Sequence, residues 1–195
     1  MTVASTPEAR AQIIPTIAKI VVSGPFGVGK TTLVSTISEI VPLRTEAKLT
    51  RAGESTDNRE MLPNKSTTTV ALDFGRITID DHLRLYLFGT PGQERFGFMW
   101  KDLTKGCLGA IIIVDTRRLE LCYQAIDYYE TNEIPFIVAA NQFEDGPRHR
   151  LDQVRIALDI DDDIPLTRFD ARRKESVKGV LITLIAHLMD QKSVQ

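Results

Sequence analysis

Ser23–Thr32 reads S-G-P-F-G-V-G-K-T-T, and this stretch is the strongest indication of the fold in the chain. This stretch follows a short apolar run rich in β-branched residues, Ile17–Val22, and precedes a segment that favours a helix, Lys30–Val41. A glycine, four further residues and then G-K-T give the spacing of a Walker A phosphate loop, in the strand–loop–helix order that this motif requires. Glycines let the backbone N–H groups of such a loop turn toward a polyphosphate, beside the positive end of the following helix. The sequence therefore predicts a nucleoside triphosphate site.

The residues of this loop divide the predicted contacts among them. Lys30 is expected to reach the β- and γ-phosphates, and the hydroxyl of Thr31 to be an oxygen ligand of Mg²⁺. The predicted nucleotide-binding residues of the loop are Gly24, Gly27, Val28, Gly29, Lys30, Thr31 and Thr32. The alternative is a glycine-rich turn that merely caps a helix, but such a turn does not require the full spacing or the Lys-Thr pair.

Length and composition are those of one globular domain. The chain has 195 residues, 43% hydrophobic and 26% charged, and its net charge of −2 offers no bulk attraction to nucleic acid or to an anionic membrane. Two cysteines without metal-ligand spacing, and the lack of a signal peptide or a transmembrane run, favour a cytoplasmic protein. We expect a monomer with no nucleic-acid partner and no direct membrane insertion. Residues 1–14 are expected to be a flexible lead-in to a domain spanning 15–195.

Strand and helix patterns alternate along the chain, which is typical of an α/β domain. Strands are predicted at 17–22, 68–79, 83–88, 110–114, 136–140 and 164–168, and helices at 30–41, 119–132, 151–158 and 174–188. The predicted fold is a single three-layer α/β/α P-loop NTPase domain with a mostly parallel six-stranded sheet and one antiparallel edge strand. Residues 43–68 are expected to form a long functional loop. Ligands of such sheets bind at the carboxyl ends of the strands, where four strand ends carry suggestive residues.

Five motifs in this order carry a family resemblance: G-P-F-G-V-G-K-T-T, T-V-A-L-D-F-G, G-T-P-G-Q-E-R-F, A-A-N-Q-F-E-D and F-D-A-R. Over residues 16–190 the chain resembles the Ras-like small GTPases, in particular the bacterial MglA-type and conservon-type GTPases that pair with Roadblock-type proteins. The resemblance implies GTP or GDP as ligand and Mg²⁺ as cofactor. It also implies two switch segments, 43–68 and 89–105, and a Roadblock-type regulatory partner in bacterial signalling.

The resemblance assigns the reaction to the second switch. The backbone N–H of Gly92 is expected to sense the γ-phosphate and Gln93 to orient the attacking water, so Gln93 and Lys30 are the predicted catalytic residues. Thr69 matches the threonine of the first switch that contacts Mg²⁺, with Thr67 and Thr68 as alternatives in the same run of hydroxyl residues.

Recognition of the base is predicted from N-Q-F-E, which stands where the family has N-K-x-D. Asn141 can bond the base edge, and the carboxylate of Glu144 can accept the ring N–H and the exocyclic amine of guanine, whereas adenine presents a ring acceptor there. Asp145 is an alternative for this role. Gln142 replaces a lysine whose stem covers the base, so we expect weaker binding. Ala171 matches the residue whose backbone N–H bonds the guanine keto oxygen.

Two departures from the family bear on mechanism. Gly89 stands where the family has the aspartate that holds Mg²⁺ through water, and Asp73 is the candidate substitute. Phe26 is bulky where the phosphate loop is often small, and it is expected to crowd the space where an arginine finger would enter. We therefore expect slow hydrolysis. The internal arginines considered as substitutes for a finger are Arg51, Arg59 and Arg95.

Two functional hypotheses follow. The first is a GTP/GDP conformational switch with slow intrinsic hydrolysis, in which an apolar face formed by Phe96, Phe98, Met99 and Trp100 meets a partner. The alternative is a scaffold module that holds GTP or ATP weakly with little or no turnover. A metabolic P-loop kinase is disfavoured because the sequence has no arginine-rich lid.

Overall fold

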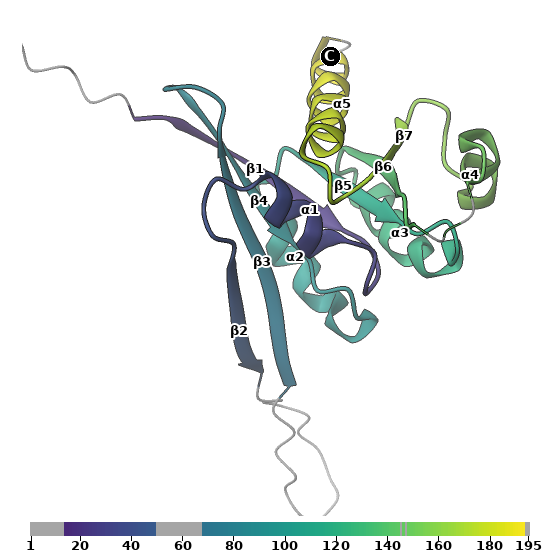
Figure 1. Cartoon of the computed structure of the whole chain (residues 1–195), viewed down its shortest axis with the longest axis horizontal. Helices are drawn as coiled ribbons and strands as arrows, with labels where there is room; N and C mark the ends of the chain where they lie inside the picture. The colour runs from purple at the N-terminus through teal and green to yellow at the C-terminus, as the bar shows by residue number, and fades with distance from the viewer. Residues whose placement is uncertain (1–13, 50–67, 145, 147, 194–195) are drawn as a thin grey trace, which may run out of the picture.

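A seven-stranded sheet forms the middle of the molecule, with strand order β2-β3-β4-β1-β5-β6-β7 (Figure 1). The computed structural model describes residues 14–49, 68–144, 146 and 148–193. The strands are β1 (Thr16–Ser23), β2 (Leu43–Leu49), β3 (Thr68–Thr78), β4 (Leu83–Gly89), β5 (Gly109–Val114), β6 (Phe136–Asn141) and β7 (Leu166–Phe169). The helices are α1 (Lys30–Ile37), η1 (Glu94–Met99), α2 (Trp100–Thr104), η2 (Leu119–Cys122), α3 (Tyr123–Thr131), α4 (Leu151–Leu158) and α5 (Lys174–Ser193).

The predicted fold class is confirmed, and the sheet has one strand more than expected. Strands β4, β1, β5, β6 and β7 pair in parallel, and β3 runs antiparallel to β4. The additional strand is β2, which pairs antiparallel with β3 inside the predicted loop 43–68. The antiparallel strand β3 therefore lies one place in from the edge. Residues 1–13 and 50–67, which hold most of the predicted lead-in and the rest of this loop, lie outside the described residues.

Strands β2 and β3 form an arm that extends past the body of the sheet (Figure 1). Residues 68–72 of β3 pair with β2 alone, whereas from Asp73 onward β3 also pairs with β4. The sequence of β2, L-R-T-E-A-K-L, alternates charged residues with Leu, Thr and Ala, which is a weak strand pattern. Its few apolar residues lie in a stretch with many charged residues, so the local pattern alone did not predict a strand.

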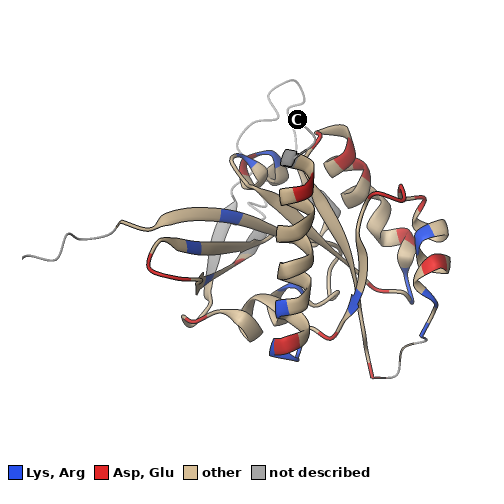
Figure 2. Ribbon diagram, turned by 90° about the horizontal axis from the view of Figure 1, so that it is seen from above, with Lys and Arg blue, Asp and Glu red and all other residues tan. Residues whose placement is uncertain are grey.

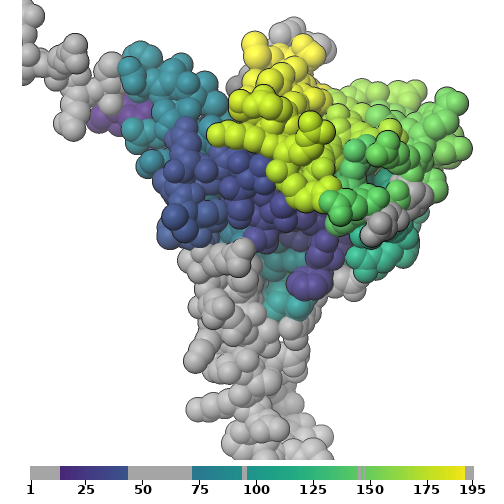
Figure 3. Space-filling view, viewed as in Figure 1, coloured from purple at the N-terminus to yellow at the C-terminus, as the bar shows by residue number. Residues whose placement is uncertain are grey.

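Helices cover both faces of the sheet and make two apolar cores. One core joins α1 and α5 to alternate residues of β1, β4 and β5, such as Ile20, Leu87 and Ile111. The other joins α3 and α4 to the intervening residues, such as Val21 and Ile112. Successive side chains of a strand point to opposite faces, so one apolar run serves both cores. Figure 3 shows α1 and α5 side by side on the first face.

The second-switch segment is short and only partly exposed. Phe96 of η1 and Trp100 at the start of α2 are buried, Met99 is half-buried, and Phe98 is 66% exposed. Trp100 packs edge-on against Tyr128, with ring centroids 5.2 Å apart. The predicted apolar face of four side chains is thus corrected, because Phe96 is buried, Trp100 belongs to the second core, and Phe98 is the one that is openly exposed.

The surface mixes charges of both signs. In Figure 2, Lys and Arg residues alternate with Asp and Glu residues around the outside, while the strands in the middle are largely uncharged. In the part of the chain that the structure describes, no helix has the length and apolar character needed to span a membrane.

Candidate functional site

The candidate site lies along one edge of the sheet, where the carboxyl ends of the parallel strands meet. The phosphate loop follows β1, Gly89 ends β4, Asn141 ends β6, and Asp170 follows β7. Because these four strands are parallel, their ends lie at one edge, as expected for open α/β sheets. The predicted convergence of these segments is confirmed.

The phosphate loop has the backbone conformation of an anion cradle. Gly24, Gly27 and Gly29 have φ values of 133°, 78° and 109°, which side chains other than hydrogen rarely allow. A Cβ on Gly29 would lie 2.6 Å from Nδ2 of Asn141, so only glycine fits there. Among the described residues no side chain caps the N-terminus of α1, and its first N–H groups are left for an anion.

Lys30 lies beneath this loop, almost enclosed. Its ammonium donates to the carbonyl oxygens of Gly24 and Pro25, at 2.7 Å each, and the residue is 8% exposed. Burial lowers the pKa of Lys30 to about 8, and the nearby carboxylate of Asp73 opposes this shift. A bound phosphate would add negative charge beside this buried amine and so favour its protonated form.

A hydrogen bond joins Thr31 to Asp73. Oγ1 of Thr31 donates to Oδ2 of Asp73 at 2.5 Å, and Asp73 is buried. Asp73 on β3 lies directly opposite Gly89 on β4, and a Cβ on Gly89 would lie 3.3 Å from that same Oδ2. The carboxylate of Asp73 thus lies beside Gly89, at the position where the Ras-like GTPases have an aspartate. A hydroxyl and a carboxylate are the oxygen donors that Mg²⁺ prefers, so these residues fit the ion.

Strand pairing places the backbone of Thr69, whereas its side chain lies outside the described residues. Thr69 lies on the arm, paired with Lys48 of β2, four residues before Asp73. Four residues of extended strand span about 13 Å, so the backbone of Thr69 lies about that far along β3 from Asp73. Thr68 pairs with Leu49 still farther along the arm, and Thr67 lies outside the described residues. The metal role of Thr69 stays a prediction.

The second switch touches the phosphate loop at Gly92. A Cβ on Gly92 would lie 2.5 Å from Nζ of Lys30 and 2.6 Å from the backbone nitrogen of Phe26, so its backbone packs directly on the loop. Gln93 follows with an exposed side chain and lines one hollow with Phe26, whose own side chain is 72% exposed. The structure thus brings both predicted catalytic residues to the same end of the loop.

The suggested internal arginines are not placed by the structure. Arg51 and Arg59 lie outside the described residues, and the same holds for the side chain of Arg95. Their role as an internal finger stays a prediction.

At the other end of the loop, Asn141 joins three segments. Its Nδ2 donates to the carbonyl oxygen of Val28, and its Oδ1 accepts from the backbone N–H of Ala171, both at 3.0 Å. Ala171 is held in turn by Thr36 of α1, whose hydroxyl donates to its carbonyl at 2.7 Å. The N–H of Ala171 that the resemblance assigns to guanine is therefore bonded to Asn141 here.

The predicted base-reading carboxylate is paired with an arginine. Glu144 is exposed and forms an ion pair with Arg172, which also donates to Asp170 at 2.9 Å. Hydrogen bonds from Arg172 hold the pKa of Asp170 below its usual range. Arg172 is the last residue of the F-D-A-R motif, and the motif did not predict a role for it at the site. Asp145, the alternative to Glu144 for recognition of the base, lies outside the described residues.

Two pockets meet over the phosphate loop. The phosphate-end pocket, about 370 Å³, is lined by Lys30, Thr31, Asp73 and Gly92. The base-end pocket, about 320 Å³, is lined by residues 141–144 and 170–172 together with Arg117. Both share Gly27, Gly29 and Thr32, so one elongated ligand can occupy both. Sizes of this order are usual for nucleotide-sized ligands.

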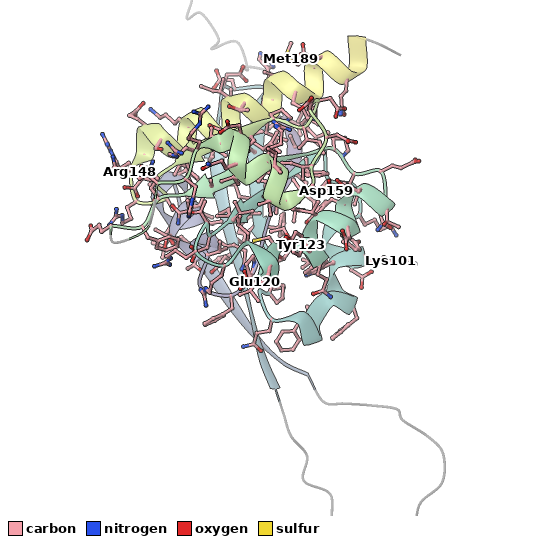
Figure 4. The ribbon with its side chains drawn as sticks, turned by 90° about the vertical axis from the view of Figure 1, so that its right-hand side faces the viewer. Lys101, Glu120, Tyr123, Arg148, Asp159 and Met189 are labelled. Atoms are coloured by element: carbon pink, nitrogen blue, oxygen red, sulfur yellow. The ribbon has the colours of Figure 1, made fainter. Side chains whose placement is uncertain are left out.

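Beyond residues 141–144 the surface is basic. A hollow of about 270 Å³ is lined there by Arg148, Arg168 and Arg173. Figure 4 shows Arg148 in the loop that enters α4, on the opposite side of the view from Lys101 of α2. Within the described residues, no group of three or more His, Cys, Asp or Glu side chains is arranged to hold a metal by itself.

Comparisons with known proteins agree with this geometry. Residues 22–191 match the model of a family described as conserved hypothetical ATP-binding proteins. The chain is 30% identical over 130 residues to the uncharacterized protein MJ1339 of Methanocaldococcus jannaschii, which covers 66% of this chain and 71% of that protein. The fold of this chain is similar to that of the G domain of the T. maritima FeoB iron transporter, with a TM-score of 0.61 and 15% identity. The similarity covers 88% of this chain and 99% of the FeoB chain. At that identity the likeness shows a P-loop GTPase-like fold and nothing finer.

Proposed function

This chain belongs to the family of conserved hypothetical ATP-binding proteins, and we start from a nucleotide-binding protein. We propose that it is a Mg²⁺-dependent GTPase that hydrolyses GTP slowly and changes conformation with the bound nucleotide. The observation that carries the proposal is the continuous pair of pockets over the phosphate loop. One end offers Lys30 and the Thr31–Asp73 pair, and the other offers Asn141 and Glu144.

The phosphate end supports triphosphate binding with a metal. Thr31 and Asp73 would hold Mg²⁺, which when bound neutralises charge on the β- and γ-phosphates. Lys30 would exchange its carbonyl partners for phosphate oxygens, and the backbone of Gly92, which packs beside Lys30, would approach the last phosphate. Gln93 would then orient the attacking water.

Guanine is the base that we propose. The carboxylate of Glu144 can accept two N–H groups from guanine, whereas adenine would face it with an unpaired ring nitrogen. Arg172 holds this carboxylate at the mouth of the base-end pocket. Gln142 stands where the Ras-like GTPases have a lysine that covers the base, so we expect a modest affinity for the nucleotide.

A second candidate is a nucleotide-binding scaffold that accepts ATP and GTP alike. Two observations favour it: Glu144 already has Arg172 as a partner, and the N–H of Ala171 is already bonded to Asn141. Both groups would have to change partners to read guanine. The resemblance to MglA-type proteins, and with it a Roadblock-type partner and a bacterial signalling role, stays a prediction.

The test combines displacement with turnover. Nucleotide released from the purified protein is identified by chromatography, GTP and ATP are then compared as displacers, and phosphate production is followed for the wild type and Gln93→Ala. We expect GTP to displace GDP at least about tenfold better than ATP, and Gln93→Ala to lose at least about tenfold in rate. Gln153→Ala, an exposed change on α4, is the matched control. Equal displacement without turnover would favour the scaffold, and failure to bind either nucleotide would contradict both candidates.

A further inference from the structure

A buried carboxylate fixes an arginine at the rim of the base-end pocket. Asp115 directly follows β5, and its side chain is 2% exposed. Nε and Nη2 of Arg117 donate to its two oxygens at 2.8 and 2.7 Å, and the backbone N–H of Arg117 donates to Oδ1 at 3.0 Å. Such a two-point contact holds the planar guanidinium in one orientation.

The held guanidinium lies on an aromatic ring. The central carbon of the Arg117 guanidinium is 3.9 Å from the centroid of the Phe143 ring. Both side chains line the base-end pocket together with Gly29 and Asn141. Phe143 comes from the N-Q-F-E segment after β6, so the contact joins two segments at the point where a base would lie.

We propose that the stacked pair of Arg117 and Phe143 is the wall against which the nucleobase packs, in place of the lysine stem that Gln142 does not provide. Because two donors of Arg117 are engaged by Asp115, the guanidinium is positioned to contribute its flat face rather than a base-reading edge. Flat aromatic and guanidinium surfaces stack on any base. The wall therefore supplies affinity for purine nucleotides in general, and the choice of guanine is left to Glu144. This inference rests on the proposed nucleotide site.

The chain offers a matched control. Arg118 lies 3.7 Å from the same carboxylate of Asp115, with a side chain that is about half exposed, but it does not line the base-end pocket. Removing Arg118 thus changes the charge around Asp115 without touching the wall.

The experiment measures affinities of the full chain, with Mg²⁺, for GDP, ADP and inorganic tripolyphosphate by calorimetry. We expect Arg117→Ala and Phe143→Ala each to weaken GDP and ADP by the same factor, about tenfold, with tripolyphosphate unchanged. Arg118→Ala is expected to bind all three as the wild type does. A cooperative melting transition well above the assay temperature will show that each variant is folded.

Three outcomes would overturn the proposal. If both variants bind GDP within twofold of the wild type, the pair is not a base wall. If tripolyphosphate weakens as much as GDP, the loss is structural and is not a loss of base contact. If the wild type binds tripolyphosphate but no nucleotide, or binds none of the three, the nucleotide site itself fails and the wall fails with it.

Discussion

At the scale of single residues, Lys30 is the group whose protonation reports on ligand binding. Burial lowers its pKa from the ordinary value of 10.5 to about 8, against the pull of Asp73. Between pH 8 and 10.5 the unfolded chain therefore binds more protons at this position than the folded one. Lys30 consequently favours the folded state more as the pH rises through that window.

Nucleotide binding is expected to draw a proton into the site. Phosphates raise the pKa of Lys30, so at pH 8 we expect uptake of about half a proton, and almost none at pH 6.5 where the amine is already charged. Calorimetry in two buffers with different ionisation enthalpies measures this uptake. A binding enthalpy at pH 8 that does not depend on the buffer would contradict the prediction.

Asp73→Asn tests the metal site. The amide keeps a hydrogen-bonding oxygen near Thr31 but removes the negative charge, so we expect GDP affinity in Mg²⁺ to fall about tenfold or more, and affinity in EDTA to stay within about threefold. Asp81→Asn, in the exposed turn before β4, is the control. An equal loss in EDTA would show that Asp73 supports the fold rather than the ion.

At the scale of the elements, Asn141 holds the loop after β1 against the loop after β7. Asn141→Ala removes the side chain that bonds the carbonyl of Val28 and the N–H of Ala171, at a cost of about 2–4 kcal/mol. Urea unfolding measures this loss. Asn132→Ala, an exposed asparagine that donates to Tyr128 at the end of α3, is expected to cost under about 1 kcal/mol. Equal losses would contradict the role of Asn141 as a tie.

The sequence predicted best those elements whose signal is local. The phosphate loop, the buried strand β5 and the helices α3, α4 and α5 follow from motif, apolar run and period. β2 was missed because its partner, β3, stabilises a pattern that is weak by itself. α1 was predicted to reach residue 41, but it ends at Ile37 because Ser38 is extended and its hydroxyl is engaged with Ile40.

The same distinction applies to the site. Lys30, Thr31, Gly92 and Asn141 lie in motifs that are contiguous in sequence, and they line the two pockets; their contacts with a nucleotide stay predictions. The pairing of Thr31 with Asp73 depends on strand register, 42 residues apart, and the stacking of Arg117 on Phe143 joins the ends of two strands. Contacts between distant segments of this kind leave no local pattern.

At the scale of the whole molecule, nucleotide should stabilise the domain as a unit. A ligand at one hundred times its Kd adds about 2.7 kcal/mol to the free energy of unfolding, which raises the Tm of a domain this size by about 5–10 °C. Differential scanning calorimetry with GDP and Mg²⁺ measures the shift. Lys30→Ala is expected to show almost none, and a full shift in that variant would contradict the placement of the phosphates.

The contact between Gly92 and Lys30 has a further consequence for which nucleotide the resting protein retains. Gly92 packs close to Lys30 and Phe26, so we expect a third phosphate to compete with Gly92 for the space beside Lys30, whereas a diphosphate would not. If about one resting molecule in a hundred has Gly92 displaced, the apparent affinity for a triphosphate falls about a hundredfold below its intrinsic value. The resting molecule would then retain the diphosphate, and its loading with the triphosphate would depend on the ratio of triphosphate to diphosphate in the cell.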